Sequence, residues 1–170
     1  MRRTLLIAIA LVAVAVAVLV GSMAASGGSS GSSGSEEQLQ RDADHWAIHQ
    51  LEKKFHRSTT MHDIDLMMSV YAPNATLVSA GKTSVGKRQI RDYWLNTSKS
   101  FKNNWISSTA AYKVKITVFG DRGTLFFECH YLDAKTNEVK LVTAADVDVA
   151  RINGRWLVTH VSGASATLRP

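Results

Sequence analysis

Asp146 and Asp148 are the residues of this 170-residue chain whose type and spacing best suit acid/base chemistry. They lie in an apolar, β-branched segment that runs into Asn153-Gly154, a dipeptide typical of tight hairpin turns. Because side chains alternate along a strand, both carboxyl groups point to one face of the sheet. A carboxyl group on a buried face has a raised pKa, which suits it to proton transfer. If the face is solvated instead, Val147 and Val149 form the core.

His130, on the preceding predicted strand, is the second candidate, since an imidazole exchanges protons near neutral pH. The face on which it lies depends on the loop that joins the two strands. A two-residue loop at Thr136-Asn137 would place Cys129 on the aspartate face, whereas a three-residue loop would place Glu128 and His130 there. Both registers are open at this point, as is a surface or structural role for the histidine.

No convincing metal site is present among the other histidines. His45 and His49 have the four-residue spacing of a metal pair, but no clear third ligand accompanies them. A solvated face of the first predicted helix is the favoured interpretation for His45, His49, His56 and His62. Cys129 is the only cysteine, which excludes a disulfide within the chain, and we expect a buried, inert thiol. We expect no metal and no organic cofactor.

The charge pattern favours an ordinary solvated surface. The chain has 20 lysines and arginines against 14 aspartates and glutamates, a formal net charge of +6. The basic residues are spread over several predicted elements and are interrupted by Asp63, Asp65 and Asp92. The aromatic and basic stacking pattern of single-strand binders is missing, so we expect no nucleic-acid partner.

The N-terminal segment predicts export. Arg2 and Arg3 precede an apolar run from Leu5 to Val20, which is the arrangement of a signal peptide or a membrane anchor. Residues 1–25 form this segment, residues 26–35 a Gly/Ser linker, and residues 36–170 one folded domain. Cleavage and retention are both compatible with the sequence. If residues 5–25 are retained, they tether the chain to the membrane, and in either case the domain lies outside the cytoplasm.

Helical periodicity in the first half and strand periodicity in the second predict an α+β fold. An antiparallel sheet would be covered on one face by three N-terminal helices. Asp63 is the predicted N-cap of the second helix. The helices are expected at 36–60, 63–71 and 87–98, and the strands at 75–79, 112–118, 124–132, 140–152 and 155–162.

Three stretches of the chain resemble the SnoaL-like family of the nuclear-transport-factor-two-like and ketosteroid isomerase-like superfamily. They are Tyr71-Ala72-Pro73-Asn74-Ala75-Thr76, Gly86 with Ile90-Arg91-Asp92-Tyr93-Trp94, and Ile152-Asn153-Gly154-Arg155-Trp156-Leu157-Val158-Thr159-His160. The resemblance implies a cone-shaped curved sheet around a central pocket that the long first helix closes, often in a dimer. Relatives are isomerases, polyketide cyclases, dehydratases, epoxide hydrolases or non-catalytic binding and association modules.

The resemblance argues against ketosteroid isomerase chemistry, which needs an Asp base and a Tyr with a protonated Asp as oxyanion hole. Ser79 stands where those enzymes carry the base, and Phe55 where they carry the Tyr. A serine is not basic at neutral pH, and a phenylalanine donates no hydrogen bond. One of Asp146 and Asp148 matches the family's buried Asp, and His130 is similar to the pocket histidine of the cyclases and dehydratases.

These observations predict a domain that binds a small, largely apolar molecule in a central pocket. Any catalysis would be cofactor-free isomerase, cyclase or dehydratase chemistry, through Asp146 or Asp148 with help from His130. The alternative is a non-catalytic association module that forms a homodimer through its sheet. An open pocket reached by carboxyl groups favours the first hypothesis, and a pocket plugged by aromatic side chains favours the second. The residues expected to bind the ligand are Trp46, Phe55, Ser79, Tyr93, Trp94 and Thr159.

Overall fold

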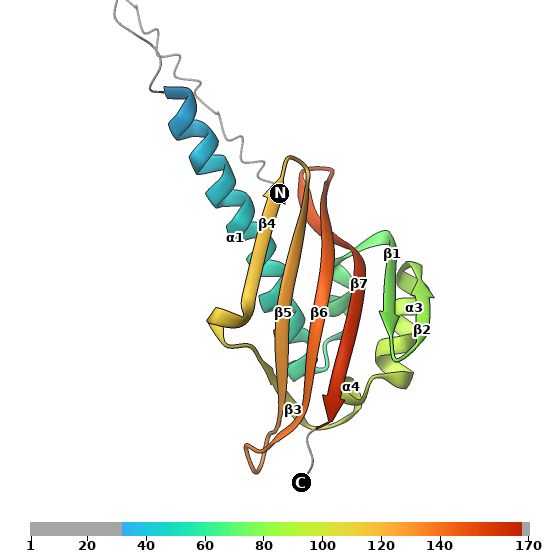
Figure 1. Cartoon of the computed structure of the whole chain (residues 1–170). Helices are drawn as coiled ribbons and strands as arrows, with labels where there is room; N and C mark the ends of the chain where they lie inside the picture. Colours follow the sequence, from blue (N-terminus) through green and yellow to red (C-terminus); the bar gives the residue numbers. More distant parts are fainter. Residues whose placement is uncertain (1–31, 168–170) are drawn as a thin grey trace, which may run out of the picture.

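The computed structural model describes residues 32–167 and shows helices packed against one curved sheet (Figure 1). The predicted signal peptide or anchor at residues 1–25 lies outside the described residues. Within residues 32–167, no helix is long and apolar enough to cross a membrane. The α+β class predicted from the sequence is confirmed.

The sheet has seven strands and is open rather than closed into a barrel. The strand order is β2-β1-β7-β6-β5-β3, and β4 also pairs with β5. β1 pairs with β7 in parallel, so the sheet is mixed and the prediction of a purely antiparallel sheet is wrong. The strands are β1 (Tyr71–Ser79), β2 (Lys82–Val85), β3 (Trp105–Ser108), β4 (Val114–Phe119), β5 (Arg122–Asp133), β6 (Val139–Ile152) and β7 (Arg155–Thr167).

The helices lie on the concave side of this sheet (Figure 1). The long helix α1 (Ser32–Met61) crosses behind the central strands, and its first four residues belong to the predicted linker. Asp63 caps α2 as expected, since its Oδ1 accepts a hydrogen bond from the Leu66 backbone N–H at 2.9 Å. The remaining helical segments are α2 (Ile64–Ser69), α3 (Gly86–Asp92), the π-helix η1 (Tyr93–Thr97), α4 (Lys99–Lys102) and the 3-10 helix η2 (Ala111–Lys113).

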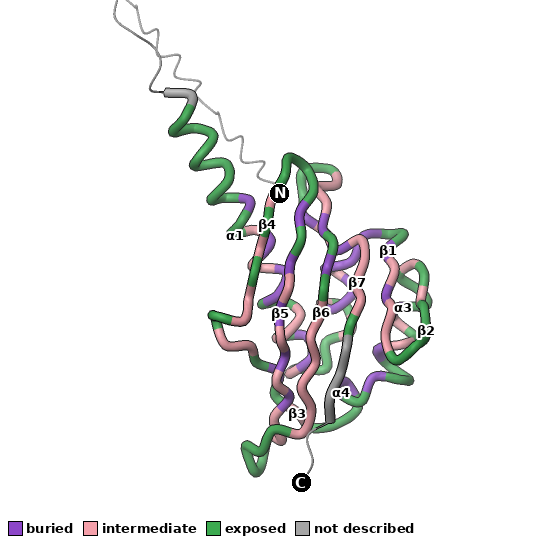
Figure 2. Tube along the Cα trace, viewed as in Figure 1, coloured by how far each residue is buried: buried purple, intermediate pink, exposed green. Residues whose placement is uncertain are grey.

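The apolar stripe that the sequence predicted for α1 is rotated in the structure. Leu39 and Trp46 are 68% and 65% exposed, whereas Ile48 and Leu51 are buried in the core. The first turns of α1 are exposed and extend beyond the sheet (Figures 1 and 2). The inward face of α1 also carries polar side chains, Asp44 among them, which hydropathy assigns to solvent.

Alternation along β6 decides which face of the sheet is buried. Val147 and Val149 point into the core, and the side chains of Asp146 and Asp148 are exposed on the outer face. Asn153 and Gly154 both have positive φ, 51° and 74°, as a tight hairpin turn between β6 and β7 requires. The solvated-face alternative for the two aspartates is therefore the correct one.

Two register shifts set the neighbours of this outer face. A register shift next to Asp148 pairs this residue with His160 instead of Thr159. A regular hairpin would put His160 on the same face as Val147, but the shift puts it on the face of Asp148. A second shift, after Tyr131, accompanies a longer β5–β6 connection. It leaves Glu128 and His130 on the outer face with Asp146.

Asp44 ties α1 to the β6–β7 hairpin. Its Oδ1 lies 2.6 Å from an Arg151 guanidinium nitrogen and accepts a hydrogen bond from Trp156 Nε1 at 3.1 Å. Arg151 also pairs with Asp121 at 2.9 Å and lies 4.8 Å over the Trp156 ring as a cation–π pair. Burial raises the pKa of Asp44, but the hydrogen bonds from Arg151 and Trp156 outweigh this and hold it below its usual value.

Candidate functional site

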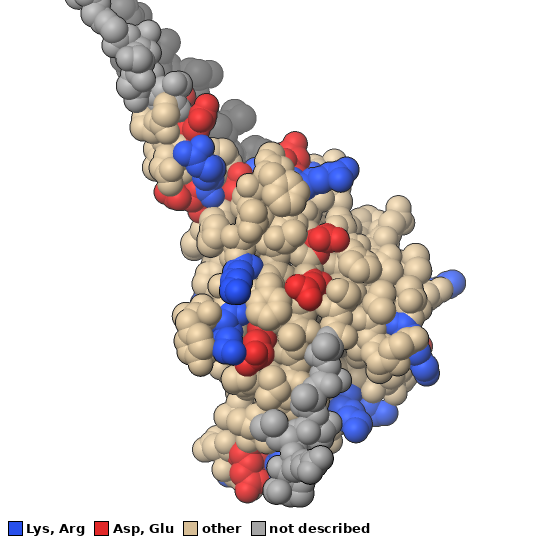
Figure 3. All heavy atoms as spheres, in the orientation of Figure 1, with Lys and Arg blue, Asp and Glu red and all other residues tan. Residues whose placement is uncertain are grey.

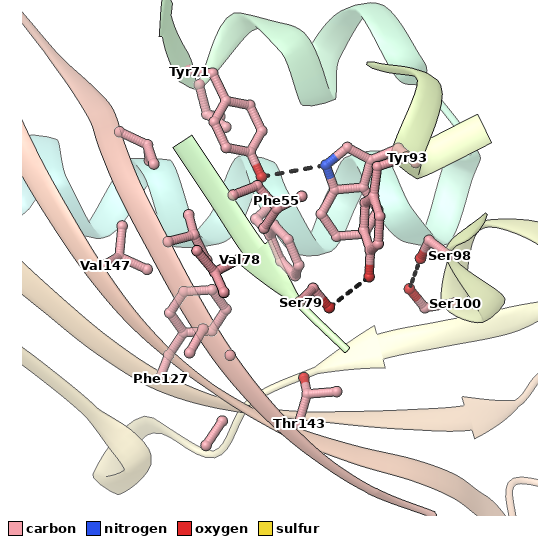
Figure 4. A pocket seen from close by; sticks show the side chains of 18 of the residues that line it. Phe55, Tyr71, Val78, Ser79, Tyr93, Ser98, Ser100, Phe127, Thr143 and Val147 are labelled. Atoms are coloured by element: carbon pink, nitrogen blue, oxygen red, sulfur yellow. Dashed lines mark hydrogen bonds between the residues drawn. The ribbon is translucent and has the colours of Figure 1, made fainter. Parts of the chain in front are cut away.

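A cavity of about 420 Å³ lies between α1, the β1 end of the sheet, the η1–α4 segment and the concave face of β5, β6 and β7 (Figure 4). Its walls are mainly apolar, because the inward-facing positions of the long strands alternate with the solvent-facing ones. The apolar and aromatic side chains that line it include Leu51, Phe55, Val70, Tyr71, Leu77, Val78, Tyr93, Trp94, Leu125, Phe127, Tyr131, Leu141, Val147, Val158 and Val161.

Phe55 joins the aromatic wall of the cavity. Its ring centroid lies 5.5 Å from that of Trp94 and 5.3 Å from that of Phe127, both in edge-on geometry. Tyr93 packs edge-on against Trp94 at 5.4 Å. Side chains from a helix, a π-helix and a strand thus form one aromatic cluster.

Three hydrogen-bonded pairs supply polar atoms to this wall (Figure 4). Trp94 Nε1 donates to the Tyr71 hydroxyl at 3.3 Å, and the Ser79 and Tyr93 hydroxyls lie 2.8 Å apart. The third pair joins the hydroxyls of Ser98 and Ser100 at 2.9 Å. Burial raises the pKa of Tyr71 far above its usual value, so its hydroxyl stays protonated.

The cavity opens at one rim. Four of the residues that line it are exposed, namely Ala80, Thr97, Lys99 and Gly163, and they come from the end of β1, the η1–α4 segment and β7. The lining residues deeper in the fold are buried or half-buried. A molecule entering from this rim would meet hydroxyl groups first and aromatic rings further in.

Among the residues that the structure describes, Glu52 is the only acidic one that lines the cavity, and it is 5% exposed. It follows Leu51 on the inward face of α1, with Phe55 one turn further along. Its Oε1 lies 2.8 Å from His56 Nε2, while His49 Nε2 lies 3.6 Å from Oε2, beyond hydrogen-bonding distance. A carboxylate with one bonded and one accessible oxygen can accept a hydrogen bond or a proton from a ligand.

The hydroxyl groups around His56 determine its tautomer. Thr109 Oγ1 donates its proton to the Glu128 carbonyl at 2.8 Å, so it can only accept from His56 Nε2, which lies 2.7 Å away. His56 Nε2 therefore carries a proton that it shares between Thr109 and Glu52. His56 Nδ1 lies 2.6 Å from Ser107 Oγ, which donates to it in the neutral ring.

No family model matches the chain, and no curated protein matches it. Solved structures match at the level of fold. A nuclear-transport-factor-two-like protein with a cystatin-like fold from Novosphingobium aromaticivorans is 14% identical, covers 81% of this chain and 91% of its own, and gives a TM-score of 0.69. The hexachlorocyclohexane dehydrochlorinase LinA-type3 from Novosphingobium barchaimii is 16% identical, with 78% and 93% covered and a TM-score of 0.66. A protein with a cystatin-like fold from Nostoc punctiforme is 17% identical, with 70% and 88% covered and a TM-score of 0.64.

The chain has the nuclear-transport-factor-two-like fold. At these identities the likeness extends to the fold and no further. It agrees with the cone-shaped, helix-covered sheet that the sequence resemblance implied.

Four of the predicted ligand-binding residues lie where a central pocket of this fold would place them. Phe55, Ser79, Tyr93 and Trp94 all line the cavity. The other two do not. Trp46 is exposed on the first half of α1, and Thr159, next to the register shift in the hairpin, donates its hydroxyl to the Asp148 carbonyl at 3.1 Å.

The predicted catalytic residues lie on the opposite side of the sheet from the cavity. Asp146 and Asp148 are exposed, and the prediction that they line the pocket is wrong because β6 turns its valines inward. His130 is half-exposed on the same outer face and pairs with Glu128 at 2.9 Å. Acidic and basic side chains lie scattered over this face of the molecule (Figure 3).

Sequence reasoning missed Glu52 at the cavity wall and its neighbour His56. His56 was assigned to a solvated helix face, but its side chain is only 12% exposed. The available signal was the four-residue spacing from Glu52 to His56, which puts both side chains on one helix face next to Phe55. Residues 32–167 contain no group of three or more potential metal ligands.

Proposed function

We propose that this chain binds one small, largely apolar molecule in the cavity under α1. The observation that carries the proposal is an open space of about 420 Å³ with aliphatic and aromatic walls, a size typical of small-molecule sites. The cavity is not plugged by the aromatic cluster, and one acidic residue, Glu52, is among the described residues that line it. Both features favour ligand binding over a purely associative role.

Polar groups near the rim would orient such a ligand. Ser79 and Tyr93 share one hydrogen bond between their hydroxyls, so each keeps capacity to donate to or accept from a bound molecule. The dehydrochlorinase that shares this fold is named for hexachlorocyclohexane, itself an apolar ring, which is in line with an apolar ligand here. Binding is supported more directly than catalysis, since Asp146, Asp148 and His130 lie outside the cavity.

A matched pair of variants tests the proposal with N-phenyl-1-naphthylamine, a neutral probe that fluoresces in apolar sites. Ala145→Phe places a ring in the cavity, and Val142→Phe places the same ring on the outer face of β6. The 170-residue chain and Val142→Phe should give saturable binding of one probe, and Ala145→Phe should bind about tenfold more weakly or not at all. Unsaturable emission, or equal affinity in both variants, would contradict the proposal.

Homodimerisation through the sheet stays a prediction. Among the described residues, no helix covers the outer face of β5 and β6 (Figure 1). Val142 lies there half-exposed. Light scattering on the purified chain would return twice the chain mass if the prediction holds, and Val142→Glu should then return the monomer mass.

Export of the chain is proposed from its sequence alone. Mass spectrometry of the protein from its native host distinguishes the two forms. A mature N-terminus near Ala25 indicates a cleaved signal peptide, and an intact Met1 in the membrane fraction indicates an anchor. An intact Met1 in the cytoplasmic fraction would contradict both.

A further inference from the structure

We propose that the molecule bound in the cavity is an apolar amine, whose ammonium group pairs with the carboxylate of Glu52. This inference rests on the proposed function and adds the chemical class of the ligand. It follows from the placement of charge in the cavity, from the free oxygen of Glu52 and from the aromatic rings beside it.

Only two charged side chains line the cavity, and they lie at different depths. Glu52 is buried in the wall that α1 contributes, and Lys99 is exposed at the rim. A buried charge is costly unless it is paired and hydrogen-bonded, and the cost falls when a ligand brings the opposite charge. A cation is therefore favoured in the depth of the cavity, whereas an anion would be held at the entrance.

The two oxygens of Glu52 are not equally occupied. Oε1 lies 2.8 Å from His56 Nε2, and the hydroxyls of Ser107 and Thr109 lie within hydrogen-bonding distance of the same ring. The nearest basic nitrogen to Oε2 within residues 32–167 is His49 Nε2, which at 3.6 Å is beyond hydrogen-bonding distance. Oε2 is thus an acceptor that suits an ammonium N–H.

The aromatic rings near Glu52 can contact the carbon atoms attached to an ammonium nitrogen. Phe55 follows one turn along α1, and Trp94 and Phe127 meet it edge-on. The face of an aromatic ring attracts an ammonium group and the polarised carbon atoms attached to it. The ligand body would then occupy the apolar wall, with its nitrogen at Glu52.

Three rigid ligands of nearly the same shape distinguish the effect of ligand charge on affinity from the effect of ligand size. They are 1-adamantanamine, 1-adamantanol and 1-adamantanecarboxylate. Their affinities for the 170-residue chain are measured by calorimetry at pH 8 and low salt. The amine should bind about tenfold more tightly than the alcohol, because only the amine forms a charge-assisted hydrogen bond with Glu52. The carboxylate should bind most weakly.

The variant Glu52→Gln removes the charge but keeps the length of the side chain and an oxygen that can accept from His56. It should abolish the preference for the amine over the alcohol. Glu128→Gln is the matched control, since Glu128 also pairs with a histidine, at 2.9 Å, but on the outer face of the sheet. This control should keep the full preference.

The outcomes separate the inference from the proposed function. If neither the naphthylamine probe nor any adamantyl ligand binds, the proposed function fails. If the probe or the alcohol binds and the amine binds no more tightly, or if Glu52→Gln keeps the preference, the amine inference is overturned. Tightest binding of the carboxylate also overturns it. If circular dichroism shows that Glu52→Gln melts at a lower temperature than the wild type, Glu52→Asp is used in its place. This variant retains the charge, so it must still bind the amine more tightly than the alcohol.

Discussion

Two glutamate–histidine pairs of nearly the same geometry lie on opposite sides of the fold. Glu52 and His56 meet at 2.8 Å on the inward face of α1, and Glu128 and His130 meet at 2.9 Å on the outer face of β5. The side chain of Glu52 is 6% exposed and that of Glu128 is 23% exposed. The same two residue types thus give a cavity group in one place and a surface group in the other.

The difference lies in what surrounds each carboxylate. The hydrogen bonds from His130 and Lys113 hold the pKa of Glu128 below its usual value, and solvent screens this exposed cluster. Glu52 has only His56 as a hydrogen-bond partner among the described residues and lies beside aromatic rings. Removing one partner of a buried pair leaves the other partner buried and unpaired, which costs far more than removing a partner at the surface.

The largest expected effect is the loss of stability in His56→Ala. This change takes away the donor to Glu52 and leaves the hydroxyl of Ser107 without its partner. The free energy of unfolding should fall by about 3 kcal/mol, measured by urea denaturation. His130→Ala, the surface counterpart, should leave the urea midpoint unchanged. Equal losses in the two variants would show that burial does not distinguish the pairs.

A buried carboxylate with three donors sharpens the comparison. Oδ1 of Asp44 accepts hydrogen bonds from Arg151, Trp156 and Gln40, and the bonds from Arg151 and Trp156 anchor α1 to the β6–β7 hairpin. Asp44→Asn weakens the pairing with Arg151 and should cost about 2 kcal/mol at neutral pH.

The pH dependence of this loss follows from the sign of the pKa shift. The pKa of Asp44 is lowered in the folded state, so its contribution is present at neutral pH and disappears as the pH falls through that lowered pKa. Urea midpoints of the wild type and Asp44→Asn should therefore differ by a constant amount from pH 7 to about pH 4 and converge as the pH is lowered from about 4 to about 2. A difference that stays constant over this lower range would refute the assignment.

The sequence predicted the hairpin and the alternation of β6 because both are local patterns. Asn153-Gly154 fixes the turn, and Val147 and Val149 alternate visibly with the aspartates. Which of the two faces is buried depends on the side of the sheet that α1 covers, and this is a tertiary property. The sequence alone therefore left both faces open.

Other errors have the same origin. Pro73 and Asn74 indicated a turn, but they lie within β1, where pairing with β7 overrides the local preference. The short strands β2 and β3 lack a clear alternating pattern and were missed. Glu52 was overlooked because a charged residue within a helix usually lies in solvent, and only the crossing of α1 over the sheet buries it.

The smallest expected effect on the fold comes from Cys129, which lies between Glu128 and His130 on β5 and points the other way. Burial raises the pKa of its thiol to about 12, so at pH 8 only about one molecule in ten thousand carries the reactive thiolate. The native protein should therefore react with Ellman's reagent far more slowly than the urea-unfolded chain. In the double variant Cys129→Ala, His130→Cys, the single thiol moves to the outer face and should react at least about a hundredfold faster than Cys129, with little change in stability. The two positions are adjacent on one strand. Comparable rates of thiol modification in the two native proteins would therefore mean that β5 does not separate an inner from an outer face. The contrast between the two glutamate–histidine pairs would then lose its structural basis.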